Sequence, residues 1–293
     1  MGPPIAIDSR KSSVLPSPVP RGIQGGRRMD RRCVAAVVAA LAVLLGSASP
    51  AVSGYCGDDV GGVRIPCNCG DIVAGDVHLL ATDPIARTRC PLDGLIVRGA
   101  PTAESVTVDL GGLTLRGSGL GIGILVERGG TDGAIIAGGT GGQNAQIIGF
   151  GTGIVSAAPS ALARLEHVTT KGNSRDGVRI REAGIVMLGV TSTDNGGDGL
   201  RVLGSGGRIV RVYAARNAGS GLVVAAPGII VEGTAEDNGR HGIVSSGPGS
   251  DLRGAVARGN GGAGIVAGTR QRIDGAVAEW NRMGDIRIRR GRR

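Results

Sequence analysis

Two stretches of the sequence repeat one pattern: TTKGNSRDGVRI at residues 169–180 and TSTDNGGDGLRV at residues 191–202. Each contains an asparagine, a glycine four residues later, and a branched apolar residue directly after the glycine. The asparagine recurs at intervals of 21 or 22 residues, as Asn173, Asn195, Asn217, Asn238, Asn260 and Asn281. One short unit repeated at a constant period is typical of a solenoid, in which each unit packs only on its neighbours.

Each repeat predicts three short β-strands. One precedes the asparagine, as in Val168-Thr-Thr170, and a second follows the glycine, as in Val178-Arg-Ile180. A third apolar segment, such as Ile185-Val-Met187, completes the unit. Because apolar residues alternate with a period of two and show no helical period, we predict an all-β fold, a parallel β-helix. From residue 106 to residue 288 the pattern allows about eight coils of roughly 22 residues.

The recurring asparagines predict a ladder of side chains. Inward positions are small or branched, and the chain has 56 glycines and only 1% aromatic residues, which indicates a narrow interior. Stacked asparagines at a bend can hydrogen-bond the coils above and below them. The alternative is that asparagine merely tolerates a turn there, but six at one position favour the ladder. Outside it we expect two rows of alternating charge: Asp194, Arg216 and Asp237, and Glu236, Arg258 and Glu279.

The beginning of the sequence predicts export. An apolar run from Cys33 to Leu45 follows several arginines and precedes small residues, as in a signal peptide. We assign residues 29–54 to this signal, with Met29 as a conventional start and residues 1–28 as a disordered extension or a misassigned start. An uncleaved membrane anchor is the alternative. We expect a secreted, periplasmic or cell-surface protein with no membrane span in its mature form.

Removal of this leader leaves 26 basic and 22 acidic side chains, a net charge of +4. Five of those basic groups lie in the last seven residues, so the remaining body is near neutral. The basic pI therefore does not predict nucleic-acid binding. We expect residues 289–293 to form a basic, solvated tail.

Four cysteines remain after the leader, all near the start of the mature chain: Cys56, Cys67, Cys69 and Cys90. In an exported protein they predict two disulfides within an N-terminal cap segment, residues 55–100, that precedes the β-helix at residues 101–288. We prefer Cys56 with Cys67 and Cys69 with Cys90, with the crossed pairing open. Zinc is a rival interpretation, but the C-x-C spacing supports it poorly.

The chain resembles a known family in two stretches. One is the repeat N-x-x-x-G-[VIL]-x-[VI] from Asn173 onward, and the other runs from Cys69-Gly-Asp71 to Leu113-Thr-Leu-Arg-Gly117. Both are similar to secreted right-handed parallel β-helix proteins of the pectate-lyase-like superfamily. That superfamily includes NosD-like periplasmic proteins and carbohydrate-active enzymes. The resemblance implies a right-handed, single-stranded helix, but the scaffold carries lyases, hydrolases, epimerases and inert surface proteins, so it specifies function poorly.

The resemblance also implies where chemistry would lie. Enzymes of this superfamily place carboxylates, with His, Lys or Arg, on one outward sheet face, to bind calcium or to act on uronic sugars. The candidates for such a catalytic patch are Asp176, Asp198, Arg179 and Arg201. Lys171, Asp194 and an outward Tyr213 are candidates for ligand binding. The alternative, which we favour, is that these charges pair with one another in solvent.

Several expected motifs are absent from the sequence. The hydrolases' Asn-Thr-Asp and Gly-His-Gly segments do not occur, and Asp83-Pro84 lacks the histidine of the epimerases' Asp-Pro-His segment. The calcium-binding repeat G-G-x-G-x-D is broken by Arg201 and Val266 at its aspartate position, and there is no P-loop. We therefore predict neither a metal site nor a cofactor; calcium would enter only with an enzyme.

These observations favour a non-catalytic scaffold or binding protein of the cell envelope or extracellular space, in contact with polysaccharide or an envelope protein. A polysaccharide lyase, uronate epimerase or hydrolase with a divergent site is the alternative. A NosD-like periplasmic assembly factor is a further alternative.

Overall fold

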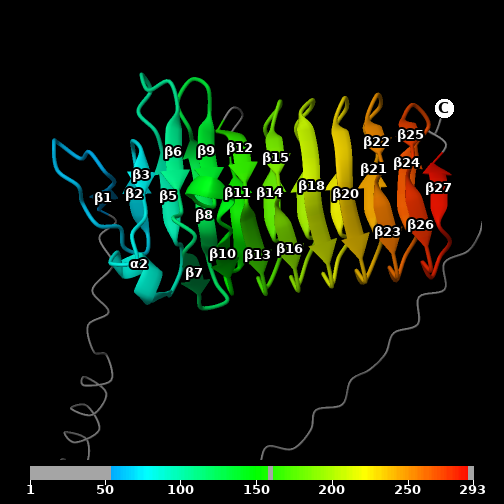
Figure 1. The fold of residues 1–293 in the computed structure, drawn as a ribbon, viewed down its shortest axis with the longest axis horizontal. Helices are drawn as coiled ribbons and strands as arrows, with labels where there is room; N and C mark the ends of the chain where they lie inside the picture. The colour runs from blue at the N-terminus through cyan, green and yellow to red at the C-terminus, as the bar shows by residue number, and fades with distance from the viewer. Residues whose placement is uncertain (1–53, 158–160, 290–293) are drawn as a thin grey trace, which may run out of the picture. The chain divides into compact units, whose positions relative to one another are not determined.

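The computed structural model describes residues 54–157 and 161–289 (Figure 1). The predicted extension, almost all of the signal peptide and the tail beyond residue 289 lie outside these residues. The strands of residues 54–289 pair in parallel and follow one another in stacked coils, as predicted. A search of the described part of the chain finds no helix long and apolar enough to cross a membrane.

One sheet, called sheet A here, takes one strand from every coil. Its members in spatial order are β1 (Tyr55–Cys56), β2 (Asp71–Val73), β5 (Leu95–Arg98), β8 (Ile122–Arg128), β11 (Thr152–Ser156), β14 (Val178–Ile180), β17 (Leu200–Val202), β19 (Leu222–Val224), β21 (Ile243–Ser245), β24 (Ile265–Gly268) and β27 (Ile286–Arg289).

Sheet B consists of two ribbons. The first contains β3 (Val77–His78), β6 (Val106–Asp109), β9 (Ala134–Ala137), β12 (Leu162–Glu166), β15 (Val186–Leu188), β22 (Asp251–Arg253) and β25 (Arg272–Asp274). The second contains β4 (Arg89–Cys90), β7 (Thr114–Gly117), β10 (Ala145–Ile148), β13 (Val168–Lys171), β16 (Thr191–Thr193), β23 (Val256–Arg258) and β26 (Val277–Glu279). Two longer strands, β18 (Arg208–Ala215) and β20 (Ile230–Glu236), belong to both ribbons. Each coil therefore has three strand segments, as predicted.

The two ribbons merge because β18 and β20 continue through the bend that separates shorter strands in other coils. The pairing of these two strands shifts register between Val210 and Val212, and Arg211 at the shift has a left-handed backbone with φ of 52°. The only helical segments among the described residues are the short helix α2 (Pro84–Arg87) and the 3-10 turn η1 (Thr140–Gly142).

The pairing register reproduces the sequence period. Val178 of β14 pairs with Leu200 of β17, which pairs with Leu222 of β19, at a constant offset of 22 residues. Nearer the N-terminus, Leu95 pairs with Ile124 and Ile124 pairs with Ile154, at offsets of 29 and 30 residues. Eight strands of sheet A lie between residues 106 and 289, which agrees with the predicted number of coils.

The asparagines form a continuous ladder inside the bend between sheet B and sheet A. Asn217 Oδ1 accepts hydrogen bonds from the backbone N of Asn195 (3.1 Å) and from its Nδ2 (2.9 Å). Asn217 repeats the same pair of donations to Asn238, and its Nδ2 also donates to the carbonyl of Ser192 (3.0 Å). All six side chains are buried. Phe150, fully buried, precedes the ladder and donates its backbone N to Asn173 Oδ1 (2.9 Å).

The ladder explains the glycine four residues after each asparagine. A Cβ on Gly199 would lie 2.7 Å from Asn217 Nδ2 of the next coil and 2.6 Å from the carbonyl oxygen of Gly221. Such contacts are shorter than real Cβ atoms show, so only glycine fits. The last described coil has Asp285 at this position, where no further asparagine follows, and Asp285 Oδ1 accepts from Asn281 Nδ2 (3.3 Å).

We expect Asn217→Ala to lower the free energy of unfolding by about 2–4 kcal/mol, because it leaves two buried N–H groups of Asn195 without their acceptor. Chemical denaturation measures this loss. The control is Asn144→Ala, which removes an exposed asparagine whose Oδ1 accepts only from Thr169 Oγ1 (3.1 Å). Equal losses in the two variants would contradict the ladder's role.

The N-terminal segment is held by two disulfides, Cys56–Cys67 and Cys69–Cys90. This is the pairing preferred from the sequence. Residues 55–100 also contribute five short strands, β1 to β5, to the two sheets. The segment expected as a cap is therefore itself wound into the first coils.

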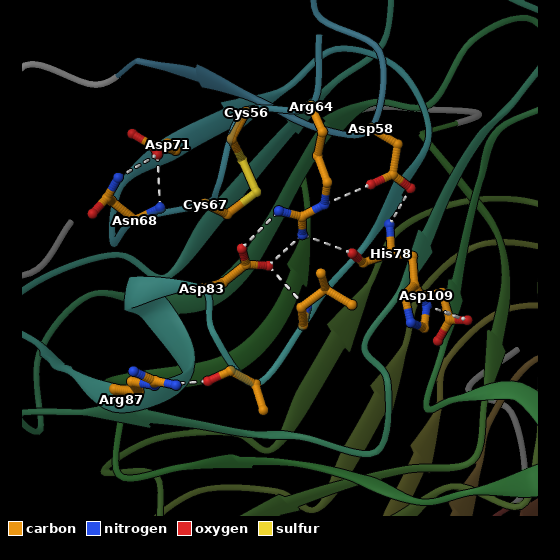
Figure 2. A network of polar contacts seen from close by, with 12 residues as sticks. Cys56, Asp58, Arg64, Cys67, Asn68, Asp71, His78, Asp83, Arg87 and Asp109 are labelled. Carbon is orange, nitrogen blue, oxygen red and sulfur yellow. Dashed lines mark hydrogen bonds and ion pairs between the residues drawn. A yellow bond between two sulfur atoms is a disulfide. The ribbon is translucent and has the colours of Figure 1, made fainter.

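An ion pair between the half-buried Arg64 and the buried Asp83 joins the loop between Cys56 and Cys67 to the next coil (Figure 2). The guanidinium of Arg64 donates to both carboxylate oxygens of Asp83, at 3.1 and 2.8 Å, and to the carbonyl of His78. Asp83 is fully buried and also accepts from the backbone N of Leu80. The hydrogen bond to Asp83 raises the pKa of the Arg64 guanidinium. Asp83, compared above with the epimerases' segment, thus holds the loop in place.

Arg64→Ala would leave Asp83 as an uncompensated buried charge, and breaking such a pair costs about 3–5 kcal/mol. We expect amide hydrogen exchange of residues 57–66 to accelerate strongly while the central coils keep their protection, because stability in a solenoid is local. Arg87→Ala, which removes only an exposed contact with the carbonyl of Ala81, is the matched control. Unchanged exchange in the Arg64 variant would show that the disulfide alone holds the loop.

Candidate functional site

The predicted patch of Asp176, Asp198, Arg179 and Arg201 assembles where the asparagine turn enters sheet A. Asp176 Oδ1 accepts from the backbone N of Asp198 (2.9 Å), and its Oδ2 lies 2.8 Å from Arg179 Nη2. Asp198 repeats this one coil later: Oδ1 accepts from the backbone N of Ser220 (2.8 Å) and Oδ2 pairs with Arg201 Nη1 (3.1 Å).

This position of the turn is a column of acceptors for backbone N–H groups. In a later coil the same place is taken by His241, whose Nδ1 accepts from the backbone N of Ala263 (2.9 Å). Burial, followed by the nearby charge of Arg289, lowers the pKa of His241. Both aspartates are thus tied to a backbone donor of the next coil and to an arginine of their own coil.

The predicted binding residues Lys171 and Asp194 lie at the end of sheet B, before the asparagine turn. Lys171 Nζ is 4.0 Å from Asp194 Oδ2, whereas Arg216 Nε is 2.8 Å from Asp194 Oδ1. The hydrogen bond from Arg216 lowers the pKa of Asp194. Asp194 and Arg216 both have left-handed backbones, with φ of 58° and 53°. The turn geometry therefore fixes where these charges sit.

The two predicted charge rows form only in part. Within residues 54–157 and 161–289, Arg216 pairs with Asp194 but not with Asp237, and Arg258 pairs with Glu279 but not with Glu236. Glu236 instead accepts a hydrogen bond from the hydroxyl of Tyr213 (3.0 Å). The carboxylate therefore has a partner that charge alternation alone did not indicate.

Tyr213, the outward tyrosine that was a candidate for ligand binding, is half-buried on sheet B. It lies in register between Thr191 and Thr234 of the neighbouring coils. Burial and the hydrogen bond to Glu236 raise the pKa of its hydroxyl. The structure thus places Tyr213 on a different sheet from Arg179 and Arg201.

A groove of 590 Å³ lies on the outer face of sheet A, over β8, β11 and β14. Its charged side chains are Arg175, Arg179, Arg181 and Asp93. Leu125, Val155 and Arg179 are successive partners in the strand pairing, so the row changes from apolar to basic along the groove. Asp93 Oδ1 accepts from the backbone N of Ile122 (2.7 Å).

The repeat did not single out Asp93, Arg175 or Arg181. The spacing of 29 residues between Asp93 and Ile122 belongs to the longer N-terminal coils. Arg181 lies two residues beyond Arg179, so the alternation of side chains along β14 places both on the same face of the sheet. Arg175 follows Asn173 in the turn. The three arginines that follow Asn173 in the sequence could therefore have predicted a basic surface here.

A second groove of 390 Å³ lies further along sheet A. Its lining includes Arg201, Arg240, His241 and Arg289, with Asp198 as its acidic member. The basic character of this face therefore continues beyond the first groove. Among the described residues, no three His, Cys, Asp or Glu side chains converge to hold a metal ion.

Glu182 is a buried carboxyl at the corner that follows β14. It is fully buried, and its Oε1 has no hydrogen-bond partner among the residues described. Burial raises the pKa of Glu182 from 4.5 to about 7, and the backbone N–H of Arg181, which donates to Oε2 (3.1 Å), offsets part of this rise. Glu182 does not line the groove.

Glu182 makes stability depend on pH. The unfolded chain releases this proton near pH 4.5 and the folded chain near 7, so the folded state loses stability as the pH rises through that window. Glu182→Gln stays neutral at every pH. Above this window we expect its free energy of unfolding to exceed that of the parent by on the order of 2 kcal/mol. Denaturation of both proteins across the pH range measures the difference. Parallel stability curves would contradict this assignment.

The match to a protein-family model agrees with this fold. The family model of the right handed beta helix region matches residues 152–289. With parallel strands in both sheets, this match identifies the fold as a right-handed parallel β-helix, consistent with the pectate-lyase-like superfamily. No curated protein sequence matches the chain.

Two solved structures of Azotobacter vinelandii are similar to the chain. The mannuronan C-5 epimerase AlgE4 A-module is 18% identical, with a TM-score of 0.40, and the match covers 70% of this chain and 66% of that one. The AlgE6 A-module is 16% identical, with a TM-score of 0.34, and the match covers 71% and 67%. The chain thus spans slightly less than two thirds of the AlgE4 module. The epimerase activity is a property of those modules.

Proposed function

We propose that this protein is an exported, non-catalytic β-helix that binds an acidic polysaccharide in the groove on sheet A. The observation that carries the proposal is the set of three arginines, Arg175, Arg179 and Arg181, along one open groove. Arg179 is paired with Asp176, whereas Arg175 and Arg181 form no ion pair with any of the described residues. Two exposed guanidinium groups are therefore available to a ligand.

The lining suits a chain of uronic acid residues. A guanidinium group matches the planar geometry of a carboxylate and can bind it through two parallel hydrogen bonds. Leu125 and Val155 provide an apolar floor beside the arginines, against which the C–H face of a sugar ring can pack. The three arginines all belong to the coil of β14, so sugar carboxylates can meet them at the basic end of the groove, beside the apolar floor.

The same geometry favours binding over catalysis. Asp176 and Asp198 each have a backbone N–H and an arginine as partners, and neither lines the groove. Asp93 is the one carboxylate among the residues that line the groove. Within this groove, a carboxylate acid or base of a lyase, epimerase or hydrolase would have to be Asp93, which makes Asp93 the position to test there.

The disulfides support export. Cys56–Cys67 and Cys69–Cys90 require an oxidising compartment, such as the periplasm or the extracellular space. Acidic polysaccharides of the cell envelope are found in the same compartments. The oxidising compartment and the basic groove therefore both favour an acidic polysaccharide as the ligand.

We expect the double variant Arg175→Gln/Arg181→Gln to bind polygalacturonate or alginate at least about tenfold more weakly, because each charged hydrogen bond contributes about 1.5–3 kcal/mol. Calorimetry measures the affinity, which should also fall as salt is added. Arg208→Gln is the matched control, since Arg208 is exposed on sheet B and has no ion pair with the described residues. Unchanged affinity in the double variant, or equal binding of neutral dextran, would overturn the proposal.

Incubation of the protein with the same uronates, with and without calcium, tests the enzymatic alternative. We expect neither unsaturated products by ultraviolet absorbance nor a change of sugar configuration by NMR. Turnover that is abolished by Asp93→Asn or Asp198→Ala would contradict the proposed non-catalytic function and show that the protein is an enzyme.

A further inference from the structure

The last described coil exposes the interior of the solenoid. Ile286 and Ile288 of β27 are 45% and 53% exposed, whereas their partners one coil earlier, Ile265 and Ala267, are fully buried. Trp280 and Met283 add further exposed apolar surface. We call Trp280, Met283, Ile286 and Ile288, with Arg287 and Arg289, the C-terminal face.

The strand edges at this face are open. β27 ends sheet A, while β25 and β26 end the two ribbons of sheet B, and no described strand pairs with their far edges. An edge of unpaired backbone groups beside apolar side chains is a template for another strand. The C-terminal face therefore has the chemistry of a β-edge interface.

The opposite end also exposes apolar residues. β1 begins sheet A at the other end of the same compact unit (Figure 1). Tyr55, Val63 and Ile65 are exposed there, next to Asp58, Asp59 and Asp76. We call these six residues the N-terminal face.

The charges of the two faces are complementary. Arg64, a basic group at the N-terminal face, pairs with both Asp83 (2.8 Å) and Asp58 (3.3 Å). One arginine thus stands against Asp83 and the three aspartates of the face, which leaves that face acidic. At the C-terminal end, Arg272 pairs with Asp274 and Glu279 pairs with Arg258. Arg282, Arg287 and Arg289 then outnumber Asp285, so this end is basic.

We propose that the C-terminal face binds the N-terminal face of a second copy of this chain, so that the coils stack head to tail. In this arrangement sheet A continues from β27 to β1 of the next copy with all strands parallel, and apolar residues of both faces become buried. Arginines of one copy meet aspartates of the next, which favours this orientation. Contact between two C-terminal faces would instead bring Arg287 and Arg289 of both copies together.

A head-to-tail contact is heterologous and leaves a free face at each end, so assembly rises with concentration into short filaments rather than stopping at a dimer. This proposal does not depend on the sugar-binding function. The groove on sheet A lies along the side of the coils and stays open in a stack.

Sedimentation velocity of the purified protein over a wide concentration range tests the contact. We expect the sedimentation coefficient to rise with concentration and the rise to weaken at high salt. Ile286→Lys/Ile288→Lys should abolish it, and so should Asp59→Lys/Val63→Lys at the other face. Leu92→Lys, which places a lysine at an exposed leucine just before β5, two strands of sheet A inside β1, should assemble like the parent. Circular dichroism confirms that each variant keeps its strands.

Mixing the two double variants gives the decisive result. Each keeps one intact face, so the mixture should form heterodimers and nothing larger, although neither variant associates alone. A parent that stays monomeric at every concentration would overturn the proposal. So would an Asp59→Lys/Val63→Lys variant that still dimerises alone, because that result would mean contact between two C-terminal faces.

Discussion

Hydrogen bonds between stacked asparagine side chains are the constraint on which the rest of the structure depends. Each interior asparagine of the ladder accepts two hydrogen bonds from the asparagine of the coil before it. It donates two hydrogen bonds, from its backbone N and its Nδ2, to the asparagine of the coil after it. The groups are buried, so an unmade bond would carry the full cost of desolvation. Coils can therefore stack in one register only.

This constraint determines which positions are free to vary. The glycine four residues later is required by the next asparagine, and the residue before each of the six asparagines has a left-handed backbone. Inward positions must be small or branched. The positions that can vary are the outward-facing ones of each sheet. Along sheet A, successive partners at one such position are Leu125, Val155, Arg179 and Arg201. Any ligand must be recognised by these variable positions.

The fold was predictable because the ladder leaves a period in the sequence that a single residue type reveals. The groove was not, because Asp93 and Arg175 come from coils of different length, and spacing alone does not bring them together. The patch of Asp176 and Asp198 was found, but its main partners are backbone N–H groups, which no sequence pattern displays. Likewise, alternating charges did not indicate that Glu236 would bind Tyr213.

The same ladder separates two kinds of surface. Among the residues that the structure describes, the side of the coils carries arginines without an ion pair, whereas the two ends carry exposed apolar residues and strand edges with no partner strand. Hydrogen exchange of the asparagine backbone amides, followed by NMR, tests the central claim most directly. The account predicts that Asn173, Asn195, Asn217, Asn238 and Asn260, which donate to the next asparagine, exchange among the slowest in the protein, and that Asn281 exchanges faster. Exchange of the first five as fast as exposed turn residues would contradict it.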